Sequence, residues 1–180
     1  MERYSDSDIT LRPVTISDAD HFMQWYFDEK VSKFCSWDVF ATKEAAVEYF
    51  MRNEITHPWN RAICMSGRVV GCVSVSPFQG SNKCRAEIGY VVGSEYCGKG
   101  VATAAVRMAA NAVFVEWGGL ERVEAVVDAE NPASQRVVEK AGFVKEGVLR
   151  KYYLLKGKPR DAVIFSLLST DPAVHYFMDI

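Results

Sequence analysis

The sequence lacks several features that mark specialised classes of protein. No apolar run approaches the roughly 20 residues that a helix needs to span a bilayer. The polar first eight residues contain no hydrophobic segment of the kind found in signal peptides. The formal net charge is only −2 over 180 residues, which gives no electrostatic basis for binding nucleic acid through a basic surface. We therefore expect neither a membrane nor a nucleic acid among the partners.

Residues that ligate metals or form disulfides are also scarce. The three histidines, His21, His57 and His175, are far apart and form no ligand cluster, so no metal site is expected. The five cysteines are odd in number and include no Cys-x-x-Cys pair, which favours reduced thiols in the cytosol or nucleus. With 49% apolar residues and no linker or repeat, the chain is expected to form one domain over residues 1–180, as a monomer or homodimer.

The first 60 residues predict a strand followed by two helices. Residues 9–14 alternate in polarity and include Pro13, which is typical of a short edge strand. Ser17 or Asp18 is suited to cap one helix, and Thr42 to open a second. The residues expected on the buried faces of these helices are Phe22, Trp25 and Tyr26, then Val47, Phe50 and Met51.

The hydrophobic period changes from helical to two after residue 60, which predicts three sequential strands. The short loops between them favour an antiparallel meander. In the third strand, at residues 84–92, Ile88 and Tyr90 face one way and Glu87 faces the other. One face of the middle strand is expected to carry Val69, Gly71, Val73 and Val75.

A glycine-rich turn follows the third strand and opens a long helix. The small residues Gly98, Gly100 and Ala102 leave backbone N–H groups uncovered at the helix start, where the positive end of the helix dipole also lies. This combination predicts a site for a phosphate or pyrophosphate. The apolar stripe expected on the helix consists of Val101, Ala105, Met108, Ala112 and Val115.

The last third predicts another strand, a helix and a final pair of strands. Residues 121–127 form the strand, Asn131 and Pro132 start the helix, and Gly142 closes it. Residues 143–155 and 162–168 form two strands around a turn, and an apolar tail follows.

Two nucleotide-binding motifs compete for the glycine turn. A Rossmann fingerprint needs glycine or alanine where this chain has Thr103, and a turn after the first strand of a parallel sheet, so it fails. Residues 93–99 fit the Gly-x-x-x-x-Gly-Lys pattern of a triphosphate-binding P-loop. The next residue is Gly100, however, so the hydroxyl that coordinates Mg²⁺ in that motif is absent. A purely structural turn between strand and helix is a further alternative.

Three segments resemble signatures of the GCN5-related N-acetyltransferases (GNAT). Residues 95–103, EYCGKGVAT, resemble the loop that binds the pyrophosphate of acetyl-CoA, and residues 131–143, NPASQRVVEKAGF, resemble the second family signature. Residues 9–13, ITLRP, resemble the usual opening strand. The segments AEIGY at 86–90 and GKPRDA at 157–162 resemble the branch that acetylates N-terminal α-amines of ribosomal proteins.

The resemblance implies an α+β fold, with a mixed and mostly antiparallel sheet of about seven strands between helices. The strands at 84–92 and 121–127 would splay apart, and acetyl-CoA would wedge between them as the acetyl donor, without a metal. Main-chain groups of Val91 and Val92 would bind the pantetheine amides. The pyrophosphate would lie on the backbone of Cys97, Gly98, Lys99, Gly100, Val101, Ala102 and Thr103.

Transfer to an amine needs a base, because only the neutral amine attacks a thioester. Glu87 is the candidate, since it lies beside the expected cleft and, by resemblance, matches the catalytic carboxylate of histone acetyltransferases in this superfamily. The alternative is a half-exposed glutamate that pairs with Arg85 or a neighbouring strand. The resemblance also implies that Asn131 contacts the pantetheine arm and that catalytic Ser134 approaches the sulfur. Both residues also suit a helix N-terminus.

Two positions depart from the family pattern. Many members carry a tyrosine that protonates the leaving thiolate where this chain has Val138, so Ser134, Tyr152, Tyr153 or a water would serve, or no acid is needed. The loop usually opens with Gln or Arg, and here that position is Cys97, so one side-chain contact is lost. A nucleophilic Cys97 at the helix start is an alternative, although no histidine partner is evident.

The leading hypothesis is an acetyl-CoA-dependent N-acetyltransferase that acts on a primary amine by direct attack in a ternary complex. The expected acceptor is the N-terminal α-amine of a protein or peptide. The alternatives are a small-molecule acetyltransferase for a polyamine or antibiotic, and a non-catalytic CoA- or nucleotide-binding module. Aromatic residues of the first third form either plain core or a wall for the acceptor: Trp25, Trp37, Trp59, Phe34 and Phe40.

Overall fold

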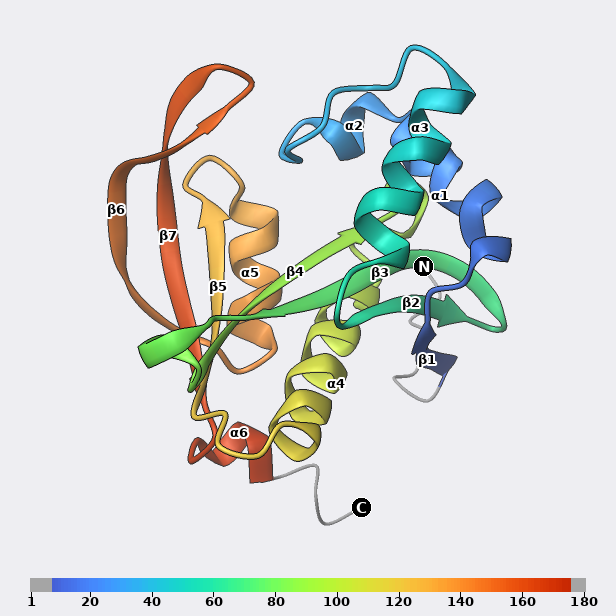
Figure 1. The fold of residues 1–180 in the computed structure, drawn as a ribbon. Helices are drawn as coiled ribbons and strands as arrows, with labels where there is room; N and C mark the ends of the chain where they lie inside the picture. Colours follow the sequence, from blue (N-terminus) through green and yellow to red (C-terminus); the bar gives the residue numbers. More distant parts are fainter. Residues whose placement is uncertain (1–7, 176–180) are drawn as a thin grey trace.

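The computed structural model describes residues 8–175, which form a seven-stranded sheet with helices on both faces (Figure 1). The strands are β1 (Ile9–Pro13), β2 (Asn60–Met65), β3 (Arg68–Pro77), β4 (Arg85–Val92), β5 (Arg122–Asp128), β6 (Val144–Leu155) and β7 (Lys158–Leu168). The helices are α1 (Ala19–Tyr26), α2 (Glu29–Ser32), α3 (Lys43–Phe50), α4 (Val101–Glu116), α5 (Pro132–Lys140) and α6 (Pro172–His175). The predicted apolar tail beyond residue 175 lies outside the described residues.

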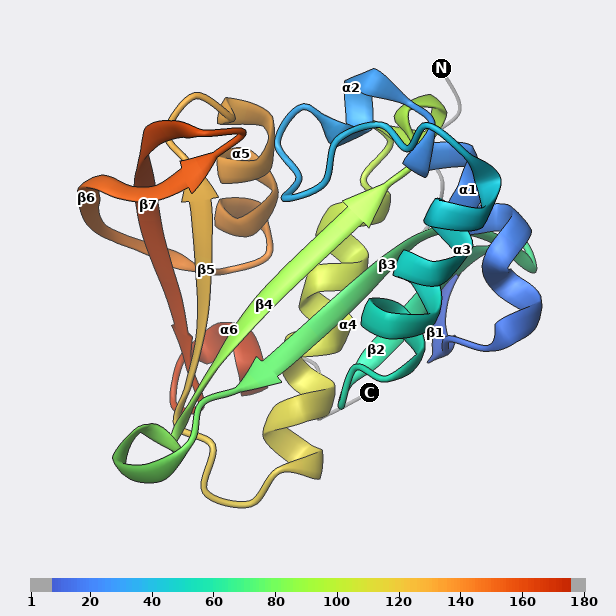
Figure 2. The same ribbon diagram turned by 45° about the horizontal axis from the view of Figure 1, so that its top comes forward.

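The sheet has the order β1-β2-β3-β4-β5-β7-β6, and all neighbouring strands are antiparallel except β4 and β5. These two are parallel and pair only where residues 85–87 lie beside residues 122–124. Beyond that point they diverge toward their carboxyl ends, as Figure 2 shows. The α+β class, the mostly antiparallel sheet and the splay are therefore confirmed. We call the open region between the two strands the fork.

Two hydrophobic cores lie on opposite faces of the sheet. In one core, Ala86 and Ile88 of β4 pack with α4 and α5. In the other, α1 and α3 pack on β2 and β3, and Val91 of β4 contributes to this side. The alternation expected along β4 is confirmed, because Glu87 is exposed between two buried neighbours. No helix among the described residues is long and apolar enough to cross a membrane.

Two helices begin at the residues that the sequence predicts. The Thr42 hydroxyl accepts a hydrogen bond from the Ala45 N–H at 3.2 Å, and the Asn131 carbonyl oxygen Oδ1 accepts one from the Ser134 N–H at 3.1 Å. Asp18 instead binds the guanidinium of Arg12, at 2.6 and 2.8 Å, and makes no side-chain cap to α1. The opening strand and α1 are thereby tied together.

One expected strand face is wrong because β3 contains a bulge. Ile63 lies opposite Gly71, whereas its neighbour Cys64 lies opposite Val69, so Val70 is the extra residue. A one-residue shift moves side chains to the opposite face. Val69 therefore packs on the α1–α3 side, while Val73 and Val75 pack on the α4 side.

Three expected core positions are also wrong, and Trp59 is buried in a different core from the other aromatic residues. Met108 is 36% exposed and Val115 is 68% exposed, since α4 buries an alanine-rich face that includes Ala105 and Ala109 against the sheet. Met51 is 36% exposed, at the point where α3 gives way to a π-helical turn at Met51–Ile55. Trp59 packs in the α4 core rather than with the aromatic residues around α1.

Candidate active site

Glu87 and Glu124 lie side by side at the base of the fork, as the last paired residues of β4 and β5. Their environments differ. Glu124 is buried and binds two cations: Arg85 Nη1 and Arg122 Nε each lie 2.8 Å from its Oε1. Glu87 is exposed and makes no hydrogen bond or ion pair with the described residues. The charge of Glu124 is thus balanced by two arginines, whereas Glu87 is left available to bind a substrate group.

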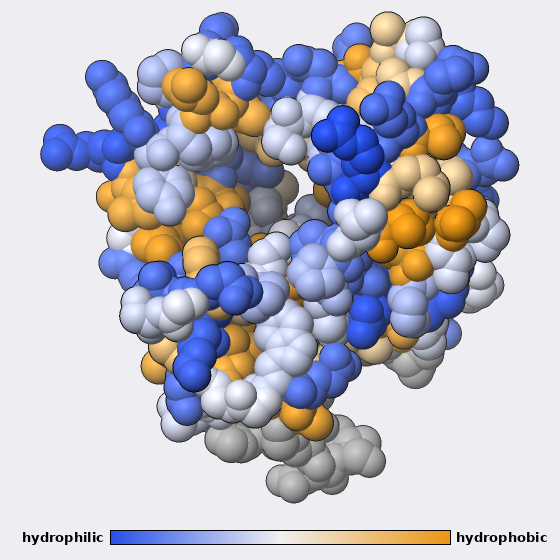
Figure 3. Space-filling view, viewed as in Figure 1, coloured by the Kyte–Doolittle hydropathy of each residue, from blue (hydrophilic) through white to orange (hydrophobic). Residues whose placement is uncertain are grey.

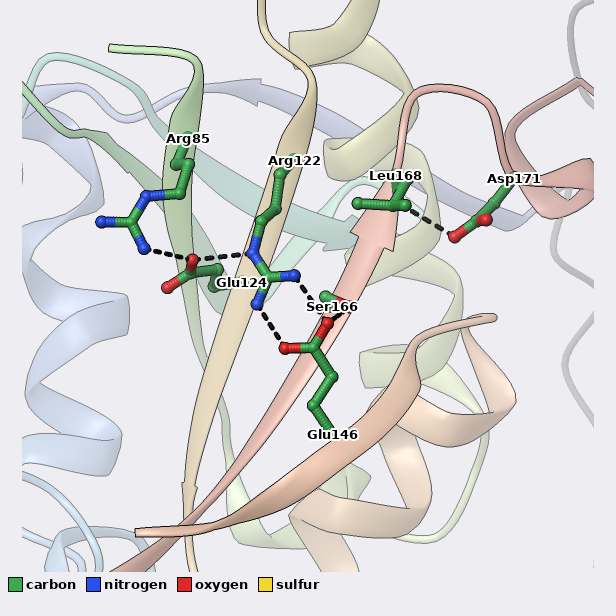
Figure 4. Close-up of polar contacts among 7 residues, drawn as sticks. All are labelled: Arg85, Arg122, Glu124, Glu146, Ser166, Leu168 and Asp171. Carbon is green, nitrogen blue, oxygen red and sulfur yellow. Dashed lines mark hydrogen bonds and ion pairs between the residues drawn. The ribbon is translucent and has the colours of Figure 1, made fainter. Parts of the chain in front are cut away.

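The cations around Glu124 are themselves held in a network, drawn in Figure 4. Arg122 donates two hydrogen bonds of 2.6 Å to Glu146, and Ser166 Oγ donates to the same carboxylate at 2.7 Å. The network joins β4, β5, β6 and β7 beneath the fork. The predicted alternative, in which Arg85 pairs with Glu87, is wrong because Arg85 binds Glu124.

The pKa of Glu87 is raised above its ordinary value. Its partial enclosure by surrounding protein atoms disfavours the charged form, and the nearby Glu124 carboxylate adds to the shift. Glu87 is exposed to solvent, so its carboxyl group can exchange protons with water. A raised pKa and access to the fork are the properties that a general base needs.

The glycine turn at the carboxyl end of β4 forms an open cradle at the start of α4. Gly98 and Gly100 have φ angles of +75° and +87°, and a Cβ added at either would meet no atom within 4 Å. The first intrahelical bond of α4 joins the Ala104 N–H to the Gly100 carbonyl at 3.0 Å. The N–H groups before it have no partner within the helix. The turn therefore has both the space and the donors for a phosphate group.

The opposite side of the fork carries the start of α5. Asn131 caps this helix, and Ser134 lies in its first turn. The Tyr90 hydroxyl reaches Ser134 from β4: its oxygen lies 2.5 Å from Ser134 Oγ and 3.0 Å from the Ser134 carbonyl oxygen. The structure thus brings together two residues that are 44 positions apart in the sequence.

The β6–β7 hairpin is fastened to the end of β5 by Asp128. This buried carboxylate accepts a hydrogen bond from the Tyr153 hydroxyl at 2.7 Å, and Arg160 donates to both of its oxygens at 2.8 and 3.0 Å. Arg160 also pairs with Glu130 at 2.7 Å. Arg160 of the GKPRDA segment therefore has a structural role, and the Tyr153 hydroxyl is occupied.

A hollow separates the side of the molecule that carries β6 and β7 from the side that carries α2 and α3 (Figure 3). Polar side chains lie around its edge in this view. The two sides meet in an ion pair, in which Lys156 Nζ of the β6–β7 turn lies 3.0 Å from Asp38 Oδ1 of the segment before α3. Tyr26, Trp37, Phe40 and Tyr49 stack beside that segment, with ring centroids 5.2–5.7 Å apart.

The family model for the acetyltransferase (GNAT) domain matches residues 8–144 of the chain. The chain belongs to the GNAT family. It is 31% identical over 179 residues to the uncharacterised N-acetyltransferase p20 of Bacillus licheniformis, covering 96% of this chain and 99% of that protein. It is an acetyl-CoA-dependent N-acetyltransferase.

Other GNAT relatives differ in the activity for which they are named. YdaF of Bacillus subtilis carries the name of a ribosomal N-acetyltransferase. It is 28% identical to this chain, and the match covers 91% of this chain and 92% of YdaF. The spermidine N(1)-acetyltransferase of Escherichia coli is 34% identical over 79 residues, covering 44% of this chain and 42% of that protein. The solved structure of Mycobacterium smegmatis RimJ with CoA-disulfide has a TM-score of 0.77 and 27% identity, and covers 95% of this chain and 88% of RimJ.

The features of a GNAT site suit acetyl-CoA in this chain. The open glycine cradle and the fork lie next to each other, because β4 leads from Glu87 through Val91 and Val92 into the turn. From Ile88 onward, β4 pairs with β3 but not with β5. The backbone groups on the edge of β4 that faces the fork therefore have no partner strand. The roles assigned to Cys97 through Thr103, to Val91 and Val92, and to Asn131 remain predictions.

The structure disfavours Cys97 as a nucleophile and Tyr153 as the acid. Burial raises the pKa of the Cys97 thiol, and Asp28 adds to this effect, which disfavours Cys97 as a nucleophile. Val138 is fully buried in the α4 core and has no proton to donate. An acid on α5 would therefore have to be another residue. Tyr153 binds Asp128, and Tyr152 is 55% exposed.

Sequence reasoning missed two features of the site. It placed Tyr90 only on the core side of β4, although the Tyr90 hydroxyl crosses to Ser134. It also assigned no role to Glu124, which is the partnered neighbour of Glu87. A polar residue inside an otherwise apolar strand was the available signal for Glu124, because buried charges are normally paired.

Proposed function

We propose that the enzyme transfers the acetyl group of acetyl-CoA to the α-amine at the N-terminus of a protein or peptide, by direct attack in a ternary complex. The observation that carries this proposal is the pairing of charges around the fork. Glu87 has no ionic partner among the described residues. Five other carboxylates around the fork and the hollow bind arginine or lysine, namely Glu124, Glu146, Asp128, Glu130 and Asp38.

This pairing favours an acceptor with one amine over a polycation. A polyamine carries several ammonium groups, each of which needs an acidic partner, whereas five carboxylates around the fork and the hollow already bind cations. An α-amine has a pKa near 8, so a substantial fraction is neutral at physiological pH, while a lysine side chain with a pKa near 10.4 is almost entirely charged. One carboxylate of raised pKa is therefore a sufficient base for an α-amine.

Each site residue has a defined task in this proposal. Glu87 accepts the proton of the attacking amine, directly or through a water. The backbone N–H groups of the turn hold the pyrophosphate, and the main chain of Val91 and Val92 holds the pantetheine arm. Asn131 contacts that arm, and the Ser134 hydroxyl stabilises the thiolate that leaves. The likeness to YdaF supports a protein acceptor.

A small amine is the second candidate acceptor. The likeness to the spermidine acetyltransferase supports it, although this likeness spans less than half of the chain. In this case the Lys156–Asp38 ion pair, which joins the two sides of the hollow, would have to open and release Asp38 as a second acidic group.

The release of CoA thiol from acetyl-CoA, measured against a matched set of amines, tests the proposal. The set contains peptides with a free N-terminus, the same peptides with a blocked N-terminus and an internal lysine, and spermidine and spermine. We expect release with the free N-termini and at most background release with the blocked peptides. Release with polyamines alone would overturn the proposed acceptor while leaving the acetyltransferase activity in place.

A further inference from the structure

The Tyr90 hydroxyl bridges the two sides of the fork. Tyr90 lies on β4 three residues beyond the last position that pairs with β5, and Ser134 lies in the first turn of α5. Their side-chain oxygens are 2.5 Å apart, which is short for a hydrogen bond between two hydroxyls. The Ser134 main chain is fixed independently, because its N–H donates to Asn131 Oδ1 at 3.1 Å. The serine hydroxyl is therefore the adjustable part of this contact.

The direction of the hydrogen bonds decides whether Ser134 has a proton to offer. The two hydroxyls carry one proton each. When the Tyr90 hydroxyl donates to the Ser134 carbonyl oxygen, 3.0 Å away, the Ser134 hydroxyl donates its own proton to the Tyr90 oxygen. When Tyr90 donates to Ser134 Oγ, the serine proton is free to point elsewhere. Tyr90 thus switches Ser134 between an occupied and an available donor.

Tyr90 retains its own proton through this exchange. The side chain is largely enclosed, and burial raises its pKa to about 12, with the Ser134 hydrogen bond opposing part of the shift. It stays neutral at physiological pH and serves as a donor. Among residues 8–175, no other tyrosine hydroxyl bonds to Ser134: Tyr153 donates to Asp128, and Val138 occupies the α5 site at which many relatives are expected to carry their acid.

We propose that Tyr90 is a positioning residue that aims the Ser134 hydroxyl at the sulfur of CoA and replaces the proton that Ser134 gives up. The inference rests on the proposed function, in which Ser134 meets the leaving thiolate. When the C–S bond breaks, the sulfur keeps the electron pair and takes the proton of Ser134 Oγ. The Tyr90 proton moves to Oγ, and water returns a proton to the phenolate.

Titration of the thiol of bound CoA tests this inference without any acceptor. Thiolate absorbance gives the pKa of that thiol in the wild-type enzyme and in Tyr90→Phe, which keeps the ring and removes the hydroxyl. Because donation from Ser134 favours the thiolate, we expect the pKa of the bound thiol to rise by about one pH unit in Tyr90→Phe. We also expect kcat to fall about tenfold or more, with little change in the KM for acetyl-CoA.

Two further variants separate positioning from structural support. Tyr153→Phe removes another enclosed tyrosine hydroxyl, on the β6–β7 hairpin, and should leave the pKa of the bound thiol unchanged. Ser134→Thr retains a hydroxyl and should keep the bound thiol pKa close to that of the wild type, whereas Ser134→Ala should raise it as Tyr90→Phe does. An unchanged thiol pKa in Tyr90→Phe, with only a higher KM for acetyl-CoA, would show that Tyr90 has a purely structural role and would overturn the inference.

The titration and the acceptor panel fail independently. If the wild-type enzyme acetylates no N-terminal amine, the proposed acceptor is wrong, and the shift of the thiol pKa still reports on Tyr90. If the panel succeeds and the thiol pKa does not respond to Tyr90→Phe, the proposed function stands and the role of Tyr90 is wrong.

Discussion

Glu87 differs from the other carboxylates at the fork in what surrounds it rather than in its residue type. Glu124 lies beside it in the sheet and is held by Arg85 and Arg122, whereas Glu87 has a raised pKa and no partner among the described residues. A carboxyl group of this kind can accept a proton from an attacking amine and lose it again to water. The chemistry proposed here depends on this single group.

The Glu87→Gln variant tests this assignment. We expect kcat near neutral pH to fall by about a hundredfold or more, because the amide cannot accept a proton, while the affinity for acetyl-CoA stays unchanged. In the wild type, activity should fall as pH decreases through the raised pKa of Glu87, since protonation removes the base. Glu48→Gln, on an exposed face of α3, is the matched control. Full activity of Glu87→Gln would show that another group removes the proton.

At the scale of elements, the glycine cradle lies between β4, which borders the fork, and the start of α4. Its first residue follows Gly100, whose φ of +87° turns the chain from the loop into the helix. Its last turn is followed by Gly119, with a similar φ of +83° and equally open surroundings. The two ends of the helix thus offer the same backbone conformation, but only the first end faces the proposed pyrophosphate.

The Gly100→Glu variant should therefore lose affinity for acetyl-CoA by about a hundredfold or more, because the side chain places bulk and negative charge in the cradle. Gly119→Glu is the matched control, with the same strain of about 1–2 kcal/mol at a positive φ and the same added charge. Equilibrium binding and denaturation of both variants separate affinity from stability. Equal affinities for acetyl-CoA in the two variants would remove the cradle from the site.

At the scale of the whole molecule, ion pairs hold the separated parts of the sheet together. Burial alone would raise the pKa of Asp128, but the hydrogen bonds from Arg160 and Tyr153 bring it below its ordinary value. Arg122, with Ser166, lowers the pKa of Glu146 to about 2. These contacts tie β6 and β7 to β5, so the hairpin that borders the hollow depends on ionised carboxylates.

Stability should therefore decrease in acid. A carboxyl whose pKa is lower in the folded state than in the unfolded chain contributes stability above its unfolded pKa of about 4, and this is lost as pH falls. For Glu146 the loss should extend from about pH 4 to about pH 2. Its side chain is 40% exposed, so solvent screening limits the pair with Arg122 to about 1 kcal/mol or less.

Urea denaturation at pH 7, 4 and 2.5 measures this effect. Glu146→Gln should be less stable than the wild type at pH 7 and closer to it at pH 2.5. The variant lacks the ionised carboxylate at both pH values, whereas the wild type loses its contribution as the pH falls. A difference that stays constant across this range would mean that ionisation of Glu146 does not contribute to stability.

The predictions from sequence succeeded where the cause was local. Thr42 and Asn131 start helices because their own side chains accept hydrogen bonds from N–H groups three residues later. The alternation of β4 placed Ile88 in a core and Glu87 outside it. Val69 and Val115 were placed wrongly, because a bulge changes the strand face and because packing against the sheet selects which helix face is buried.

By itself, the sequence determined the order of strands and helices, the glycine turn before α4 and the family of the protein, since each depends on residues close together in the chain. Only the tertiary structure decided where β4 and β5 separate, which of two adjacent glutamates has partners, and that Tyr90 meets Ser134. These outcomes depend on contacts between residues about 40 positions apart. Such contacts form only when the whole sheet has folded, so no local pattern specifies them.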